Sequence, residues 1–313
     1  RAGTDVQGQS LTAEDELFIL TQAGLYLLAT RGFSAREVRI CYERVESLCH
    51  SLNRPLVLFS ALEGQWRHSL VADKQTATMR IAKRAYSLAQ EQNDSALKIG
   101  AHRALAVTLY YLGDFENAHL DAVRGVQIWR SGGVQFPVEQ ASAPAVVCPC
   151  IEALAAWHLG GITSCQPAMG EAISLAKELN DMFGLVVALN YAVFLGYLER
   201  DPAKVECLAS DVIELSTRHN FAVYSSTGAV CRAWARSVSG GAVDAIPWIE
   251  DGIEAYRATG SMLEVPLFLA QKAEALHLAD RTSEALEAIR EAEALVERFE
   301  ARWWSAELHR LRG

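Results

Sequence analysis

"YYLGDFENA", residues 110–118, is the stretch that decides the fold of this chain of 313 residues. An aromatic pair leads into Leu112 and Gly113, an Asp-Phe dipeptide follows, and Ala118 opens a new apolar run. Glycine readily adopts the left-handed backbone conformation that ends many helices. The stretch therefore predicts a turn between two helices, and recurrence of this turn would make the fold a repeat.

The same kind of turn recurs along the whole chain. Breaks between helices are predicted at Gly32, Ala72, Gly113, Gly160, Arg200, Gly240 and Asp280. Their spacing is 40 or 41 residues, with one interval of 47 residues. A second series marks helix ends at Asn53, Asn93, Gly133, Asn180, Asn220 and Gly260. Small apolar residues after the breaks keep the same period: Ala77, Ala118, Cys165, Val205, Ala245 and Ala285. Such a period indicates a repeat architecture.

Each unit reads as two helices joined by a short turn. In the seventh unit, the second helix carries one apolar stripe: Ala285, Ile289, Ala292, Val296 and Phe299. Ser34, with Glu37 three residues later, predicts a capping box at a helix start. Because a two-helix unit cannot bury its stripe alone, the units must stack. The sequence predicts an all-α fold, an α-solenoid of about seven helix pairs, as a single domain over residues 1–313.

Charge and hydropathy argue against two classes of partner, nucleic acids and membranes. With a net charge of −9, the chain lacks the clusters of Lys and Arg that neutralise phosphates, so we expect no nucleic-acid partner. No apolar stretch approaches the roughly 20 residues that cross a bilayer, so we expect no membrane partner. The seven cysteines form no CxxC pair and read as reduced, mostly buried residues of a cytoplasmic protein.

"LGDFENA" resembles the turn of a tetratricopeptide repeat, with matching residues at Leu105, Ala106, Leu109, Gly113, Phe115 and Ala118. The period of about 40 residues exceeds the usual 34. More specifically, the chain resembles the C-terminal repeat region of large bacterial signalling proteins, which carry a class III nucleotide cyclase domain and a predicted ATPase domain ahead of the repeats. This resemblance covers nearly the whole chain. The stretches that carry it are "LLATRGFSAREVRICYERVESLC" (27–49), "VVCPCIEALAAWHLGG" (146–161) and "EAYRATGSMLEVPLFLAQKAEAL" (254–276). The chain departs from that family at Ala143-Pro144-Ala145, where the family has Asp-Pro-Gly.

The motifs that would indicate an enzyme are missing from the sequence. A nucleotide-binding loop of the form GxxxxGK[ST] is lacking, as are HExxH and GxSxG. The eight histidines have no ligand-like spacing, and we expect His102 and His158 to cover helix surfaces rather than bind metal. We therefore expect no catalytic residues, no metal and no cofactor.

A solenoid instead offers a concave surface lined by the first helix of each unit. Counting back from each turn, by analogy with tetratricopeptide repeats, gives the candidate binding residues Phe59, Trp66, Arg103, Tyr110, Trp157, Asn190, Phe194, Tyr197, Trp234 and His277. Their aromatic side chains could stack a ligand or grip a peptide. A tightly wound superhelix would instead bury them as core, and the sequence leaves both interpretations open.

Two further segments lie outside the regular pattern. The inserted residues 131–145, with two glycines and two prolines, form either a lid over the groove or a surface excursion. The last residues begin another first helix, and we expect Trp303, Trp304, Leu308 and Leu311 to leave an apolar patch. Because this unit is incomplete at Gly313, the chain reads as a piece of a longer protein.

Two functions remain. The first is a regulatory interaction module, whose partner is another protein or the adjacent catalytic domains of the same polypeptide. The alternative is a sensor that binds a small molecule in its groove, as does the repeat domain of a maltotriose-responsive transcription activator, which these long repeats resemble. A small ligand predicts a closed, aromatic-lined pocket, whereas a protein partner predicts a long open groove or an exposed edge.

Overall fold

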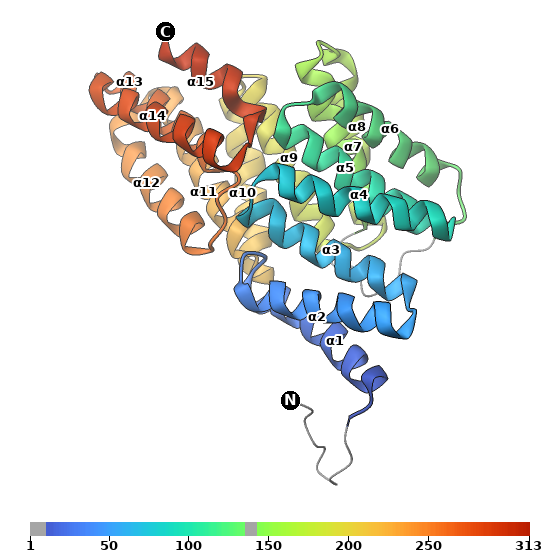
Figure 1. Ribbon diagram of the computed structural model, residues 1–313. Helices are drawn as coiled ribbons and strands as arrows, with labels where there is room; N and C mark the ends of the chain where they lie inside the picture. Colours follow the sequence, from blue (N-terminus) through green and yellow to red (C-terminus); the bar gives the residue numbers. More distant parts are fainter. Residues whose placement is uncertain (1–10, 135–142) are drawn as a thin grey trace.

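The computed structural model describes residues 11–134 and 143–313, and every regular element in these two ranges is helical (Figure 1). The helices are α1 Ala13–Arg31, α2 Arg36–Leu52, α3 Pro55–Ala72, α4 Gln75–Gln92, α5 Ser95–Leu112, α6 Phe115–Arg130, α7 Pro144–His158, α8 Ile162–Glu178, α9 Met182–Leu198, α10 Pro202–His219, α11 Ala222–Arg236, α12 Ala242–Ala258, α13 Val265–Leu278, α14 Thr282–Phe299 and α15 Ser305–Arg312, with short turns η1 Ser237–Gly241 and η2 Arg302–Trp304. The predicted all-α solenoid is confirmed.

Left-handed residues separate the helices at the predicted period. Within units, φ is positive at Gly32, Gly113, Gly160, Arg200, Gly240 and Asp280. Between units, it is positive at Asn53, Asn93, Gly133, Asn180, Asn220, Gly260 and Glu300. Glycine and asparagine tolerate this conformation best, which is why they mark the register in the sequence. The break at Ala72 is the exception, because α3 ends there on an extended Asp73.

The two helices of a unit are buried differently. In α9, a first helix, every residue from Val186 to Tyr197 is buried. In α14, a second helix, only one stripe is buried and the rest carries charge. The small residues Ala118 and Ala245 are fully buried and Ala285 nearly so, as expected where two helices approach closely. First helices thus form the inner layer and second helices the outer layer of the superhelix.

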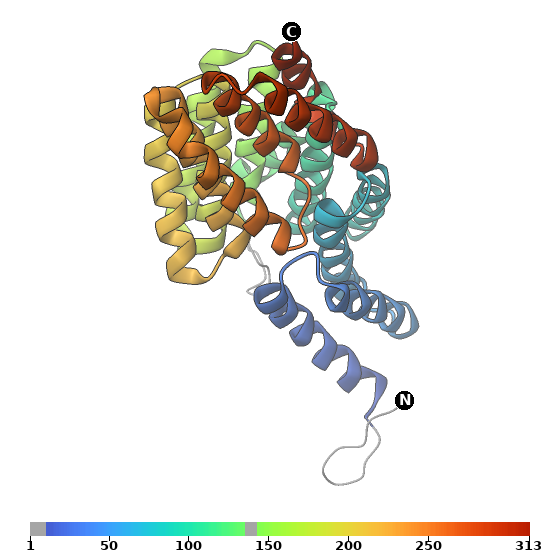
Figure 2. The same ribbon diagram turned by 90° about the vertical axis from the view of Figure 1, so that its left-hand side faces the viewer.

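The superhelix closes on itself after about one turn. The Met262 N–H, in the loop before α13, donates to the Val71 carbonyl at the end of α3 over 3.1 Å. The Thr76 N–H donates to Glu300 Oε2 over 3.3 Å, and Lys74 pairs with the same carboxylate at 3.6 Å. Figure 2 shows the C-terminal helices, in red, beside the blue and teal helices of residues 55–112. The concave face is therefore the interior of a ring.

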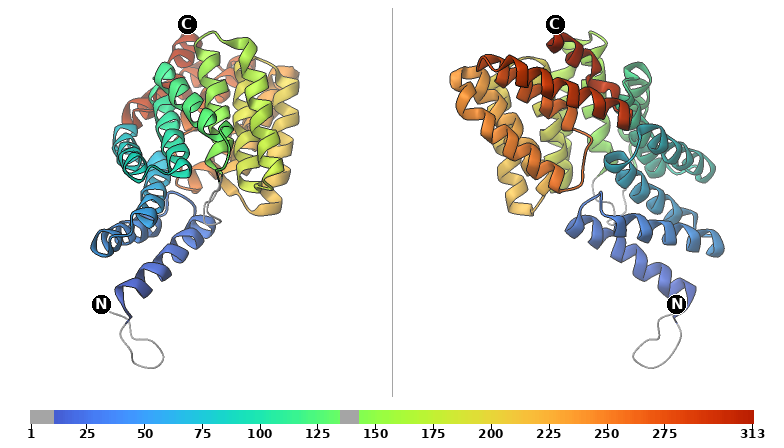
Figure 3. Two further views of the ribbon diagram at one scale, coloured as in Figure 1. Left: turned by 90° about the vertical axis from the view of Figure 1, so that its right-hand side faces the viewer. Right: turned by 60° about the vertical axis from the view of Figure 1, so that its left-hand side comes forward.

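Two further views show this ring from other sides, with α1 projecting at one end of it (Figure 3). The turn between α1 and α2 takes part in the closure, because the Ser34 hydroxyl donates to the Thr259 carbonyl. The predicted capping box at Ser34 and Glu37 is therefore wrong. Helix α2 begins one residue later, with Ala35 at its N-cap and no side-chain cap, since the Ser34 hydroxyl is used in a tertiary contact.

The expected apolar patch at the C-terminal segment is also absent from the described residues. Trp303, Trp304 and Leu308 are each no more than 2% exposed. Instead of lying on the outside of the seventh unit, η2 turns both tryptophans into the ring. The ring is narrow enough for helices on its opposite sides to contact them.

Candidate functional site

A cavity of about 80 Å³ lies inside the closed ring. Its walls come from α3, α5, α7, α9, α11, α12 and the loop before α13. Four side chains in the wall can carry charge or hydrogen bond through an amide: Arg67, Arg103, Asn190 and Glu264. The aromatic part of the wall includes four tyrosines: Tyr111, Tyr191, Tyr224 and Tyr256. The ring thus encloses a small, largely apolar cavity that a few polar and charged side chains reach.

Arg103 forms a buried ion pair with Glu63 at one side of this cavity. The guanidinium also lies 4.6 Å over the ring of Trp66, whose Nε1–H donates to the Thr108 hydroxyl over 3.0 Å. Arg103 is only 1% exposed, and its Nε has no hydrogen-bond partner within the protein. A buried donor without a partner is costly, so a water or a ligand atom in the cavity is the available acceptor.

Glu264 lies in the cavity wall on the loop that closes the ring. Its carboxylate accepts a hydrogen bond from the Thr227 hydroxyl over 3.0 Å and another from the Asn190 side chain. Burial outweighs these two bonds and raises the pKa of Glu264 to about 7. Asn190 is 2% exposed, and its Oδ1 atom has no partner. This side of the cavity therefore holds a carboxyl group that titrates near neutral pH.

The four tyrosines and Arg67 complete the titratable groups of the cavity wall. Burial raises the pKa of all four tyrosines, and the charge of Glu264 raises each of them further. The charge of Arg67 acts on Tyr224 in the opposite direction. Burial lowers the pKa of Arg67 to about 10, and the charge of Arg103 lowers it further. The two arginines and Glu264 thus give the cavity groups of both signs.

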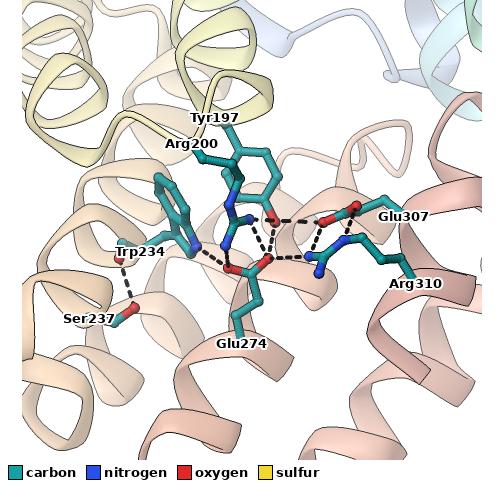
Figure 4. Close-up of polar contacts among 7 residues, drawn as sticks. All are labelled: Tyr197, Arg200, Trp234, Ser237, Glu274, Glu307 and Arg310. Atoms are coloured by element: carbon teal, nitrogen blue, oxygen red, sulfur yellow. Dashed lines mark hydrogen bonds and ion pairs between the residues drawn. The ribbon is translucent and has the colours of Figure 1, made fainter. Parts of the chain in front are cut away.

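A second polar cluster ties the last units and α15 together (Figure 4). Its centre is the Glu274 carboxylate, which accepts from the Tyr197 hydroxyl (2.7 Å), both Arg200 Nη atoms (2.7 and 2.9 Å) and Trp234 Nε1 (2.9 Å). Arg310 of α15 lies 3.5 Å from the same carboxylate. Burial raises the pKa of Glu274, but these hydrogen bonds together hold it below its ordinary value. Arg200 has a strained left-handed backbone, and the two hydrogen bonds that its side chain donates to Glu274 offset this strain.

An aromatic cluster fills the interior next to the Glu274 cluster. The Trp303 ring lies 5.6 Å from that of Tyr110, 5.2 Å from that of Tyr111 and 5.9 Å from that of Phe194. Trp304 extends it towards Tyr197, with ring centroids 5.4 Å apart. The chain therefore covers a large part of its own concave wall with the C-terminal segment.

The ten predicted site residues divide into groups. Three of them line the cavity: Trp66, Arg103 and Asn190. Four of them belong to the two neighbouring clusters: Tyr110, Phe194, Tyr197 and Trp234.

The other three lie apart from the cavity. Phe59 is buried between the second and third units, and Trp157 is partly buried against the core. His277 is exposed.

Several cavity residues were missed by counting back from the turns. Arg67, Tyr111 and Tyr191 each follow a predicted position by one residue, which is a rotation of about 100° on a helix. Tyr224 lies in the first turn of α11, and Glu264 lies on the loop that closes the ring. No local sequence signal marks these residues, because they meet only when the superhelix winds around the cavity.

Two histidines, His102 and His158, and most of the cysteines take part in the packing of the helices. His102 is 5% exposed and bonds Asp121 at 2.8 Å, and His158 stacks on Phe115 with ring centroids 3.9 Å apart. Burial lowers the pKa of His158 to about 4. The expectation that His102 covers a helix surface is wrong, whereas His158 is half-buried. All seven cysteines are free thiols, and only Cys207 is exposed.

Within the described ranges, no group of three or more His, Cys, Asp or Glu side chains is placed to hold a metal ion. None of the described helices is both long and apolar enough to span a membrane. The inserted segment runs from the end of α6 to the start of α7, and residues 135–142 lie outside the described residues. The lid and the surface excursion both remain predictions for it.

No family model matches the sequence. An uncharacterised protein of Rhizobium meliloti is 22% identical over 312 residues, which are 97% of this chain. The chain spans 30% of the length of that relative.

The fold is similar to solved tetratricopeptide-like structures. One is a Rap protein complexed with competence and sporulation factor, with a TM-score of 0.64, 12% identity, and 96% of this chain and 86% of that chain covered. Another is NprR in complex with its cognate peptide NprX, with a TM-score of 0.60, 10% identity, and coverage of 96% and 82%. A third is a signal transduction ATPase from Pyrococcus horikoshii with a tetratricopeptide repeat sensor, with a TM-score of 0.52, 11% identity, and coverage of 93% and 46%.

Proposed function

We propose that this chain is a non-catalytic regulatory repeat module of a larger bacterial signalling protein of the cyclase and predicted-ATPase type, working in the cytoplasm. It binds a ligand inside its closed ring, and closure of the ring changes its contacts with its partners. The observation that carries this proposal is that the loop of Met262 and Glu264 both closes the ring and lines the cavity. A ligand that contacts this loop prefers the closed ring, so binding and closure are coupled.

The similar structures support a regulatory role for such a ring. Two of them were solved with a bound signal, a factor in one and a cognate peptide in the other, and the third is described as having a repeat sensor. The relative that is about three times longer leaves room for domains that such a sensor would control. The aromatic-lined and closed interior favours a small ligand over an extended partner in the groove.

The test is a thermal-shift screen of the chain against a library of metabolites and short peptides. A ligand at 100 times its dissociation constant stabilises the folded protein by about 2.7 kcal/mol. We expect at least one such ligand, and we expect Asn190→Leu to remove its effect while Asn117→Leu, an exposed control, retains it. A library without any stabilising compound, or a ligand that binds both variants equally, would contradict recognition in the interior.

A second candidate function is a scaffold that docks the adjacent domains of the same polypeptide on its outer surface. Helix α1 favours it, because Phe18 is 67% exposed and Ile19 is 49% exposed at the end of the ring. Exposed apolar side chains that lie together mark interaction sites. Phe18→Ser in the full-length protein should then weaken contact between α1 and its neighbouring domains, seen as faster proteolysis between them. An unchanged cleavage rate would rule this surface out.

A further inference from the structure

The volume of the cavity limits what it can hold. At about 80 Å³ it has roughly half the volume of a cavity that accommodates benzene, and a water molecule in the liquid occupies about 30 Å³. A ligand of about five non-hydrogen atoms fits, whereas a nucleotide, a sugar or a peptide segment does not fit without an opening of the ring.

Charges of both signs line this small volume. Arg67 and Arg103 bring two guanidinium groups from α3 and α5, and Glu63 is the carboxylate that pairs with Arg103. Guanidinium groups bind carboxylates through paired, charge-assisted hydrogen bonds. Glu264 brings a carboxyl group from the closing loop, and the hydrogen bonds that it accepts come from neutral side chains. Carboxylates and tyrosine rings together suit an ammonium group.

Two buried atoms without hydrogen-bond partners indicate which chemical groups the ligand carries. Arg103 Nε is a donor that lacks an acceptor, and Asn190 Oδ1 is an acceptor that lacks a donor. Both side chains are at least 98% buried and both line the cavity. An anion alone would satisfy only the arginine, and a cation alone would satisfy only the asparagine. A molecule with a carboxylate at one end and an ammonium group at the other satisfies both.

We propose that the cavity binds a small zwitterion of the size of the simplest amino acids, with its carboxylate towards Arg67 and Arg103 and its ammonium group towards Glu264, Asn190 and the tyrosines. This inference rests on the proposed function and names the class of ligand for the same site. The ligand contacts α3 and α5 on one side and the closing loop on the other. Its two charges therefore join the parts of the chain that meet when the ring closes.

Titration calorimetry on the wild-type chain tests the class of ligand directly. The probes are glycine, L-alanine and β-alanine, with glycinamide and glycolate as analogues of the size of glycine that each lack one of its charges. At least one of the three zwitterions should bind, and both analogues should bind about tenfold more weakly or worse. If no zwitterion binds at millimolar concentration, or if either analogue binds as well as glycine does, the proposed class is wrong. A cavity that holds only water gives the first of these results.

Two matched variants locate the binding. Glu264→Gln keeps the shape and hydrogen-bonding capacity of the side chain but removes its charge, and it should weaken zwitterion binding about tenfold or more. Glu307→Gln makes the same change beside the Glu274 cluster, outside the cavity, and should bind as the wild type does. Equal affinities in the two variants would overturn the placement of the ligand. If Glu264→Gln fails to fold, the analogue series on the wild type still decides the class.

The results also separate this inference from the proposed function. If the library yields a ligand of another class that Asn190→Leu abolishes, the interior is a sensor site and only the zwitterion is wrong. If neither the library nor the amino acids bind, both proposals fail.

Discussion

The pH dependence of stability should change when the charge of Glu264 is removed. Burial raises the pKa of this carboxyl from 4.5 to about 7 in the folded chain. Between these two values the folded state keeps the proton that the unfolded state releases, so the free energy of unfolding falls as pH rises. The full displacement corresponds to about 3 kcal/mol. Glu264→Gln is neutral at every pH and should lack this loss.

His158 acts in the opposite direction over a similar range. Burial lowers its pKa from 6.5 to about 4, so the unfolded state takes up a proton before the folded state does, and stability is lost as pH falls. The two contributions partly cancel in the wild type. The difference between wild type and Glu264→Gln removes the His158 term, because both chains contain that residue.

The assay is urea unfolding followed by circular dichroism, for both chains at matched ionic strength, between about pH 5 and pH 8. Relative to the wild type, the variant should gain about 2–3 kcal/mol between the ends of this range. Glu307→Gln, measured beside it, controls for loss of a partly exposed carboxylate. Parallel curves for wild type and Glu264→Gln would refute the reasoning, because they would mean that Glu264 ionises as it does in water.

Three further predictions follow from the packing and the cavity. Ala245→Leu overpacks the contact between α11 and α12 and should lower the free energy of unfolding by about 1–3 kcal/mol. The control Ala255→Leu, on the exposed side of α12, should change it little. Equal melting temperatures for the two variants would contradict the register. Trp303→Ala removes the centre of the interior aromatic cluster and should lower the free energy of unfolding by about 3–5 kcal/mol. Trp248 is half-exposed, so Trp248→Ala should lower it much less. A small loss of stability in Trp303→Ala would mean that η2 is not packed inside the ring. Calorimetry with glycine should show tighter binding as pH rises through about 7, since Glu264 then ionises. An affinity that falls over this range would contradict the contact between Glu264 and the ammonium group.

The sequence predicted the repeat because its markers are local. Asn93, Gly113 and Asn220 stand where the backbone must be left-handed, and few other residues adopt that conformation easily. The stripe from Ala285 to Val296 likewise follows from helical periodicity alone. These features depend on neighbouring residues, so they are readable without the tertiary structure.

The closure of the ring depends on the small rotation that each unit adds, and this rotation is not encoded by any single motif. Counting from the turns therefore found Trp66, Arg103 and Asn190 but not Tyr224 or Glu264, which approach them only after a full turn. Ser34 shows the same limit. Its spacing to Glu37 favours a local cap, and a carbonyl 225 positions further along the chain takes its hydrogen bond instead.

Hydrogen exchange at the Met262 amide measures closure of the ring most directly. This N–H donates to the Val71 carbonyl on the other side of the ring, so its protection depends on closure. We predict that the amide is protected in the chain alone and becomes more protected when the interior is saturated with a zwitterion, while the exposed amide of Gly133 stays unprotected. Exchange of Met262 at the rate of Gly133, with or without ligand, would contradict a ring that closes around its ligand.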